Sequence, residues 1–385
     1  MIKINEYTKI AVSSLSKKLD DNHPKIRAKA AESLGKIGSE TAIPGLLKAL
    51  EDSDEDVRRN AAEALGNIGT ETAIAGLLKA LEHSNKDVRR YAAEALAKIG
   101  SETAIPGLLK ALEDSDEDVR LNAAEALGNI GSETAIAGLL KALEHSNKDV
   151  RRNAAVALGN IGTETAIAGL LKALEDSDGY VRGYAAAALG KIGSETAIPG
   201  LLKALEDSDN YVRRNAAEAL GNIGTETAIA GLLKALEDSY DVRGYAAAAL
   251  GKIGSETAIP GLLKALEHSY QDVRLNAAAA LGKIGSETAI PGLLKALEHS
   301  YQDVRLNAAE ALGNIGSETA IPGLLKALEH SYQDVRLNAA FALGKIGTET
   351  AIAGLLKALE HSNKDVRWNA VQALAKIGTE TAIPG

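Results

Sequence analysis

The sequence contains no cysteine, so neither a disulfide framework nor a thiolate metal site can form. It also lacks any run of about 18 apolar residues, the length that a membrane-spanning helix needs. The N-terminal segment MIKINEYTKI is too polar for a secretory signal peptide. We therefore expect a protein without membrane segments in a reducing compartment, the cytoplasm.

A basic excess is missing as well. Lys and Arg number 43 against 52 Asp and Glu, giving a formal net charge of −9, whereas nucleic-acid-binding domains usually carry a basic footprint. Four arginines could still contact phosphates, but glutamates are interleaved with them. They are Arg59, Arg90, Arg152 and Arg214. The balance of charge argues against a nucleic-acid partner.

Sequence motifs for enzymatic chemistry are not found. H-E-x-x-H, G-x-S-x-G and G-x-G-x-x-G do not occur, and GKIGSE lacks the order of a phosphate-binding loop. Six histidines recur in the segment LEHS, at intervals of 31 residues or more. If these lie on successive layers of helices, they are roughly 10 Å apart, too far to share a zinc ion. We predict no enzyme activity, no metal and no cofactor.

Aromatic residues make up only 3% of the chain, so its apolar mass consists of Ala, Leu, Ile and Val. Ala and Leu are the strongest helix formers among these, which favours an all-α fold. The dipeptide Val-Arg recurs every 31 residues from Val57 to Val366, with one interval of 30 between Val212 and Val242. A fixed period along the whole chain indicates a repeat architecture rather than separate globular domains.

One repeat reads SETAIPGLLKALEDSDEDVRRNAAEALGNIG (residues 39–69) and holds two helices of about 10–14 residues. Their apolar residues share one face each: Ile43, Leu46, Leu47 and Leu50, then Val57, Ala61, Ala64, Leu65 and Ile68. We expect Pro44 in the first turn of the first helix, after Ser39 or Thr41 as its cap. Ser53 and Asp56 are predicted to cap the second helix, which Gly69 ends. A pair this small must stack on its neighbours.

The segments D-V-R, A-A-x-A-L-G-x-I-G and A-I-P-G-L-L-K-A-L resemble HEAT-like repeats of the phycobilisome-lyase (PBS lyase) type. They are also similar to the consensus of artificial HEAT-like repeat libraries. The resemblance covers residues 39–378 and implies a right-handed α-solenoid of about twelve 31-residue helix-turn-helix repeats. We predict an atypical N-terminal capping unit at 1–38, eleven repeats at 39–378 and the truncated start of a further repeat at 379–385. The resemblance places no active site on this sequence.

The repeats differ most on one face of the second helix. With Val57 as the origin and about 100° per residue, Arg59, Asn60, Glu63 and Asn67 lie opposite the apolar stripe. The resemblance implies that this face lines the concave surface of the solenoid. Early repeats carry charges there and later repeats carry apolar groups, so we predict that a partner binds to this face.

Two further sets of residues point to the same surface. Tyrosines enter the loop between the helices from the sixth repeat onward, and Tyr is enriched at binding hot spots. A row of Asn could hydrogen-bond an extended peptide backbone, because its amide both donates and accepts. Duplicated tyrosines that only cover the loop, and Asn that is merely tolerated, are the alternatives. The predicted partner-binding residues are Tyr180, Tyr184, Tyr211, Tyr240, Tyr245, Tyr270, Leu275, Asn276, Tyr301, Leu306, Asn307, Tyr332, Leu337, Asn338, Phe341 and Trp368.

These patterns predict a non-catalytic scaffold that binds a protein or peptide on the concave face and the Tyr-bearing loops. Three alternatives stay open. They are a subunit or chaperone-like component of a bilin lyase, an engineered or consensus-like scaffold without a native target, and a DNA-binding protein. End-to-end self-association through the incomplete C-terminal repeat is a further expectation. The one-residue deletion near Tyr240 has no explanation in the sequence.

Overall fold

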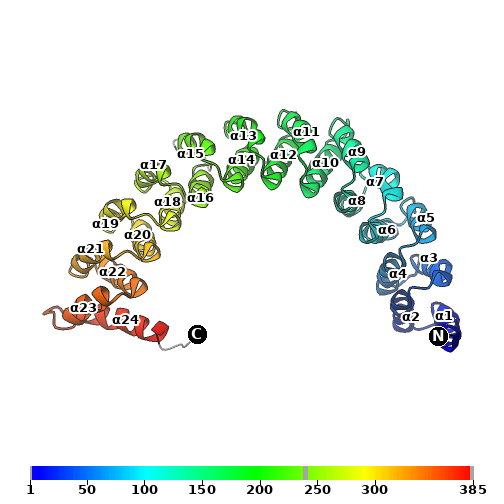
Figure 1. Ribbon diagram of the computed structural model, residues 1–385, viewed down its shortest axis with the longest axis horizontal. Helices are drawn as coiled ribbons and strands as arrows, with labels where there is room; N and C mark the ends of the chain where they lie inside the picture. The colour runs from blue at the N-terminus through cyan, green and yellow to red at the C-terminus, as the bar shows by residue number, and fades with distance from the viewer. Residues whose placement is uncertain (1, 237–241, 382–385) are drawn as a thin grey trace. The chain divides into compact units, whose positions relative to one another are not determined.

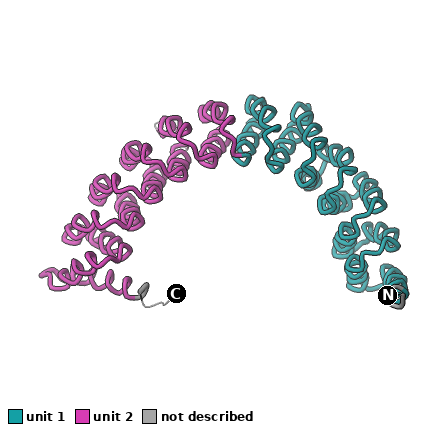
Figure 2. Tube along the Cα trace, in the orientation of Figure 1, with its two compact units in different colours: residues 1–192 teal, residues 193–385 magenta. Residues whose placement is uncertain are grey.

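The protein is helical throughout the computed structural model, which describes residues 2–236 and 242–381. Those residues form α-helices, short 3-10 turns and tight connections, and they include no strand. The chain divides into two compact units, residues 1–192 and 193–385 (Figure 2). Each unit is a stack of helix pairs, as the repeat predicts.

Each pair consists of what we call a first helix and a second helix. In unit 1, α1 (Ile2–Lys18) pairs with α2 (Pro24–Ile37). The later first helices are α3 (Ile43–Ala49), α5 (Glu71–Ala80), α7 (Ile105–Ala111), α9 (Glu133–Ala142) and α11 (Ile167–Ala173). Their second helices are α4 (Glu55–Ile68), α6 (Lys86–Ile99), α8 (Glu117–Ile130), α10 (Lys148–Ile161) and α12 (Gly179–Ile192).

Unit 2 repeats this arrangement. Its first helices are α13 (Ile198–Ala204), α15 (Ile229–Ala235), α17 (Ile259–Ala265), α19 (Ile290–Ala296), α21 (Ile321–Ala327) and α23 (Glu349–Ala358). Its second helices are α14 (Asn210–Ile223), α16 (Val242–Ile253), α18 (Gln271–Ile284), α20 (Gln302–Ile315), α22 (Gln333–Ile346) and α24 (Lys364–Thr381). Helix α24 runs across residue 378, where the sequence places the end of the last full repeat.

The second helix ends as predicted, but its N-terminal cap is a different residue. The side chain of Asp54, not Ser53, accepts the backbone amides of Asp56 and Val57 at the start of α4. Asp is as good a cap as Ser, and here Asp54 is the residue with the extended backbone of an N-cap. Gly69 ends the helix with a φ of 63°, a left-handed conformation that favours glycine.

The first helix is shorter than predicted in most repeats, whether its second residue is Pro, as in α3, or Ala, as in α11 and α15. Pro44 lies in the first turn of α3, which has only 7 residues and follows a 3-10 turn over Glu40–Ala42. Helix α5, which has Ala at this position, is continuous over 10 residues, but α11 and α15 also have Ala there and are only 7 residues long. Ser39 forms no backbone cap and instead bonds the hydroxyl of Thr41.

The apolar stripes of both helices form the core of each unit. Ile43 and Leu46 of α3 and Val57 and Leu65 of α4 are fully buried, as their spacing predicts. Leu47 is half-buried, and its side chain packs against the first helix of the next repeat. A Cβ on Gly76 would come within 2.5 Å of a methyl group of Leu47, so glycine makes room for this leucine.

Second helices approach one another more closely than first helices do. A Cβ on Gly251 of α16 would lie 2.6 Å from the Cα of Ala280 in α18, so backbone meets backbone there. Between first helices a leucine side chain separates the backbones. Within each unit, taken alone, the second helices therefore form the inner layer of the curve (Figure 1). The variable residues Arg59, Glu63 and Asn67 of α4 are exposed.

Candidate functional site

In unit 2 a row of exposed apolar side chains crosses the inner layer. Leu275 of α18, Leu306 of α20, Leu337 of α22 and Trp368 of α24 each follow the buried valine of the repeat by two residues. Their exposed fractions are 39%, 49%, 49% and 62%, and Phe341, one turn after Leu337, is 40% exposed. We call these five residues the apolar row. Exposed apolar groups that are contiguous mark interaction sites on soluble proteins.

Lysines flank this row on one side. They lie eight residues further along the same helices, or about 12 Å. Lys283 of α18 is exposed and has no ion pair among the described residues. Lys345 of α22 donates to the side-chain oxygen of Asn314, and the Lys376 ammonium lies 3.8 Å from the centre of the Phe341 ring. No carboxylate of the described residues neutralises Lys283 or Lys345.

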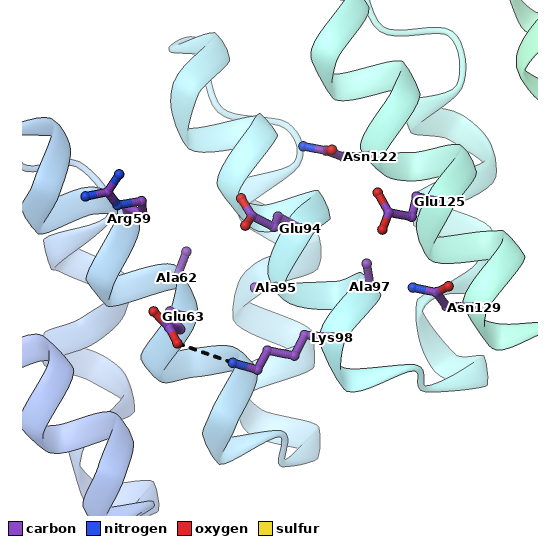
Figure 3. Close-up of a pocket in the computed structure, with 10 residues that line it drawn as sticks. All are labelled: Arg59, Ala62, Glu63, Glu94, Ala95, Ala97, Lys98, Asn122, Glu125 and Asn129. Carbon is purple, nitrogen blue, oxygen red and sulfur yellow. Dashed lines mark ion pairs between the residues drawn. The ribbon is translucent and has the colours of Figure 1, made fainter. Parts of the chain in front are cut away.

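The inner layer of unit 1 has a different chemistry. Helices α4, α6 and α8 enclose a hollow of about 440 Å³ lined by charged residues, amides and alanine (Figure 3). Lys98 is 3.5 Å from Glu63 across this hollow, and Arg152 of α10 is 3.3 Å from Glu117. Leu121 of α8 occupies the position of the apolar row and is 43% exposed, but it has no apolar neighbours in that row. Charges in unit 1 thus largely pair with each other.

The Asn residues are not the free ladder that the sequence suggests. The amide nitrogens of Asn276 and Asn307 donate to backbone carbonyls one turn earlier in their own helices, those of Asp272 and Asp303. Asn338, a predicted partner-binding residue, is buried and cannot contact a partner directly. The physical reason is local, because a short amide side chain in a helix can bond the carbonyl four residues back.

The predicted tyrosines occupy different environments. Tyr180, Tyr270, Tyr301 and Tyr332 are exposed, whereas Tyr184, Tyr211, Tyr245, Asn276 and Asn307 are half-buried. Tyr240 lies outside the described residues. Tyr180 and Tyr184 belong to unit 1, and the other described residues of the predicted site belong to unit 2.

Three of these tyrosines replace a helix cap. Tyr270, Tyr301 and Tyr332 are the N-cap residues of α18, α20 and α22, and none forms a side-chain cap hydrogen bond. The same position holds Asp54 in α4 and Asn85 in α6, both of which accept backbone amides. A missing cap costs about 1 kcal/mol per helix. We call these three residues the cap tyrosines; Tyr180, by contrast, follows a normal cap, Asp178.

Each cap tyrosine is held beside the arginine of the preceding repeat. The Arg274 guanidinium lies 4.0 Å from the centre of the Tyr301 ring, and Arg305 lies 6.0 Å from that of Tyr332. These contacts place the rings at the edge of the inner layer while leaving Tyr301 47% and Tyr332 63% exposed. The tyrosines therefore cover the loop and remain accessible at the same time.

Sequence reasoning missed a ladder of ion pairs that links the repeats. In most repeats the Arg of the Val-Arg pair donates to two loop carbonyls of its own repeat, as Arg89 does to His83 and Ser84. In several repeats it also reaches a carboxylate of the next repeat, and Arg89 binds both oxygens of Asp114 at 2.7 and 2.8 Å, whereas Arg243 bonds the His268 ring. Burial raises the pKa of Asp114, but the hydrogen bonds from Arg89 and from the Asp116 amide outweigh it and leave this pKa below its ordinary value.

The LEHS histidines belong to the same ladder. His83 stands where other repeats have Asp, and its Nδ1 accepts the amide of Asn85 at 3.0 Å, just as Asp52 accepts the amide of Asp54. With His at this position in the next repeat, the arginine turns to another carboxylate, as Arg58 does to Asp87. The alternation of Asp and His at one position was the sequence signal for this exchange.

Among residues 2–236 and 242–381, no group of three or more His, Cys, Asp or Glu side chains is arranged to hold a metal ion. Over that same part of the chain, no helix combines the length and the apolar character needed to cross a membrane.

Solved structures similar to this one are helical repeat proteins. Kap95p, in a complex with RanGDP, matches with a TM-score of 0.63 at 14% identity, over 99% of this chain and 64% of Kap95p. Kap121p bound to Nup53p matches with a TM-score of 0.60 at 14% identity, over 97% of this chain and 50% of Kap121p. This chain therefore spans one half to two thirds of those relatives, and at such low identity the similarity concerns the fold alone.

A third similar structure is the complex of CpcE and CpcF, the phycocyanin lyase of Nostoc sp. PCC7120. It is 27% identical, with a TM-score of 0.37, over 63% of this chain and 94% of that one. Comparison with curated protein sequences finds no match.

The family comparison covers nearly the whole chain. The HEAT repeat family matches nine overlapping segments: 12–97, 74–159, 105–174, 136–209, 167–243, 198–268, 229–313, 259–332 and 321–385. These matches agree with the paired helices and the stacked core of each unit. The chain belongs to the HEAT repeat family, and its fold is an all-α solenoid.

Proposed function

We propose that this protein is a binding scaffold without catalytic activity of its own, and that unit 2 binds a protein or peptide. The apolar row and the cap tyrosines form the proposed contact surface. Of the residues predicted from the sequence, this surface keeps Tyr270, Leu275, Tyr301, Leu306, Tyr332, Leu337, Phe341 and Trp368. Asn338 is left out because it is buried.

The observation that carries this proposal is the loss of three consecutive helix caps in favour of exposed tyrosines. Natural sequences are locally consistent, and departures from local rules are expected at functional sites. The three cap tyrosines lie in three consecutive repeats, and in each of these repeats Leu follows Val-Arg, at Leu275, Leu306 and Leu337. Both changes expose apolar or aromatic area on the inner side of unit 2, the kind of area that supplies binding energy.

The test compares two double variants in affinity capture from an extract of the source cells. Leu306→Asp with Tyr301→Ala alters the proposed surface, while Leu121→Asp with Tyr180→Ala makes the same changes in unit 1. All four residues are exposed, so both variants should keep a helical circular dichroism spectrum. We expect the first variant to lose captured proteins that wild type and the second variant retain. Equal capture by both variants would refute this surface.

A further inference from the structure

The chemistry of the apolar row also indicates what kind of segment it binds. Building on the proposed function, we propose that the occupant is an amphipathic α-helix whose apolar stripe covers the apolar row and whose acidic flank faces Lys283 and Lys345. The helix would run across α18, α20, α22 and α24, between the cap tyrosines and the lysines.

Backbone hydrogen bonds favour a helical partner over an extended one. An extended peptide needs partners for its own N–H and C=O groups when it is buried in a groove. The Asn side chains that could supply them are engaged or hidden, because Asn276 and Asn307 donate to their own helices and Asn338 and Asn369 are buried. A helical partner satisfies its backbone internally and needs only side-chain contacts.

The spacing of the apolar row also matches an α-helix. Packed helices lie about 8–10 Å apart, so a row with one apolar side chain per repeat has about that period. Seven residues of α-helix rise about 10.5 Å, so a heptad of apolar residues would meet one row residue per repeat. A β-strand presents the same face about every 6.6 Å and does not keep step with the row.

The charges beside the apolar row favour an acidic partner. In helices α16 to α24, the positions six and ten residues after the Val of each repeat hold four lysines and one carboxylate, that of Glu310. The lysines are Lys252, Lys283, Lys345 and Lys376. On the opposite edge the carboxylates of Asp303 and Asp334 already pair with Arg274 and Arg305. The surface is therefore basic on one side of the row, and it complements a helix with carboxylates on the matching flank.

The experiment is a selection from random 20-residue peptides displayed on phage. The baits are wild type, a Leu306→Asp/Leu337→Asp variant, and Leu121→Asp as the matched control at the same helical position in unit 1. We expect peptides that are enriched on wild type and on the control, but not on the double variant, to be acidic with apolar residues at heptad spacing. A synthetic copy should bind at least tenfold more weakly to the double variant and to Lys283→Glu/Lys345→Glu.

The outcomes separate the two proposals. If row-dependent peptides are basic, or contain proline and alternate apolar and polar residues, the acidic helix is wrong and the binding function of unit 2 stands. If no enriched peptide depends on the row, both the helix and the proposed surface are refuted. If the lysine variant binds the acidic peptide as tightly as wild type does, the charge argument fails.

Discussion

Restoring a missing helix cap should stabilise unit 2 locally and weaken binding at the same time. Tyr332→Asn converts the segment His330 to Asp334 into HSNQD, close to the native HSNKD at residues 83–87, where Asn85 accepts the amide of Asp87. A side-chain cap is worth about 1 kcal/mol. The substitution removes an Arg305 contact at 6.0 Å, the outer limit of a cation–π interaction, and a contact between the Tyr332 and His330 rings, whose centres are 5.3 Å apart.

A gain of about 1 kcal/mol corresponds to roughly fivefold slower exchange for amides that open locally at the start of α22. Hydrogen exchange measured by mass spectrometry on peptides covering residues 330–340 reports this directly. Tyr180→Asn is the matched control, because the amide of Tyr180 is already accepted by the cap Asp178, and it should leave exchange in α12 unchanged. Unchanged or faster exchange in α22 would refute the idea that the cap tyrosines sacrifice stability.

Three further predictions concern the packing and the ladder of ion pairs. Gly251→Ala should destabilise unit 2 by about 1–3 kcal/mol in urea unfolding, because the added Cβ would meet the backbone of Ala280. Gly313→Ala is the control, since its Cβ would meet mainly the flexible Lys345 side chain, and it should be neutral or stabilising by up to about 1 kcal/mol. Asp114→Asn should cost about 1.5–3 kcal/mol by removing the charged partner of Arg89, while Asp20→Asn, in an exposed pair with Lys48, should cost less than about 0.5 kcal/mol; equal costs would contradict the ladder. Burial and the nearby Arg243 and Arg274 lower the pKa of His268, so the folded state disfavours its protonation. Neutral His268 therefore contributes fully to stability above the ordinary pKa of about 6.5, and this contribution declines as the pH falls toward the lowered value. Between pH 7.5 and 5.5, the free energy of unfolding of the His268→Asp variant should thus decrease less than that of wild type.

The sequence was sufficient for the fold because its signal is repeated. Apolar spacing, Pro44 and Gly69 each recur in many copies, so the helix pair, its core and its C-terminal stop could be predicted. The exposed positions of Leu306 and Trp368 also followed from helical periodicity. Ser53 and Asp54, by contrast, are adjacent residues that both make good caps, and only the backbone conformation distinguishes them.

Contacts between repeats were harder to predict. The ion pair between Arg89 and Asp114 joins residues 25 apart, and its alternative between Arg58 and Asp87 joins residues 29 apart. Which one forms depends on whether Asp or His occupies the intervening loop, a choice made across the interface between two helix pairs. The side-chain rotamers that engage Asn276 and Asn307 with their own helices are likewise set by local geometry that periodicity does not contain.

The single tryptophan of the chain provides the most direct test of the binding surface, because Trp368 ends the apolar row and is 62% exposed. Its fluorescence should be titrated with a partner captured by wild type, with acrylamide quenching measured in the free and bound states. If the partner covers the row, emission shifts to the blue and quenching falls, and neither change occurs with Leu306→Asp/Leu337→Asp. A partner that binds wild type while Trp368 keeps the emission and quenching of the free protein would contradict this account.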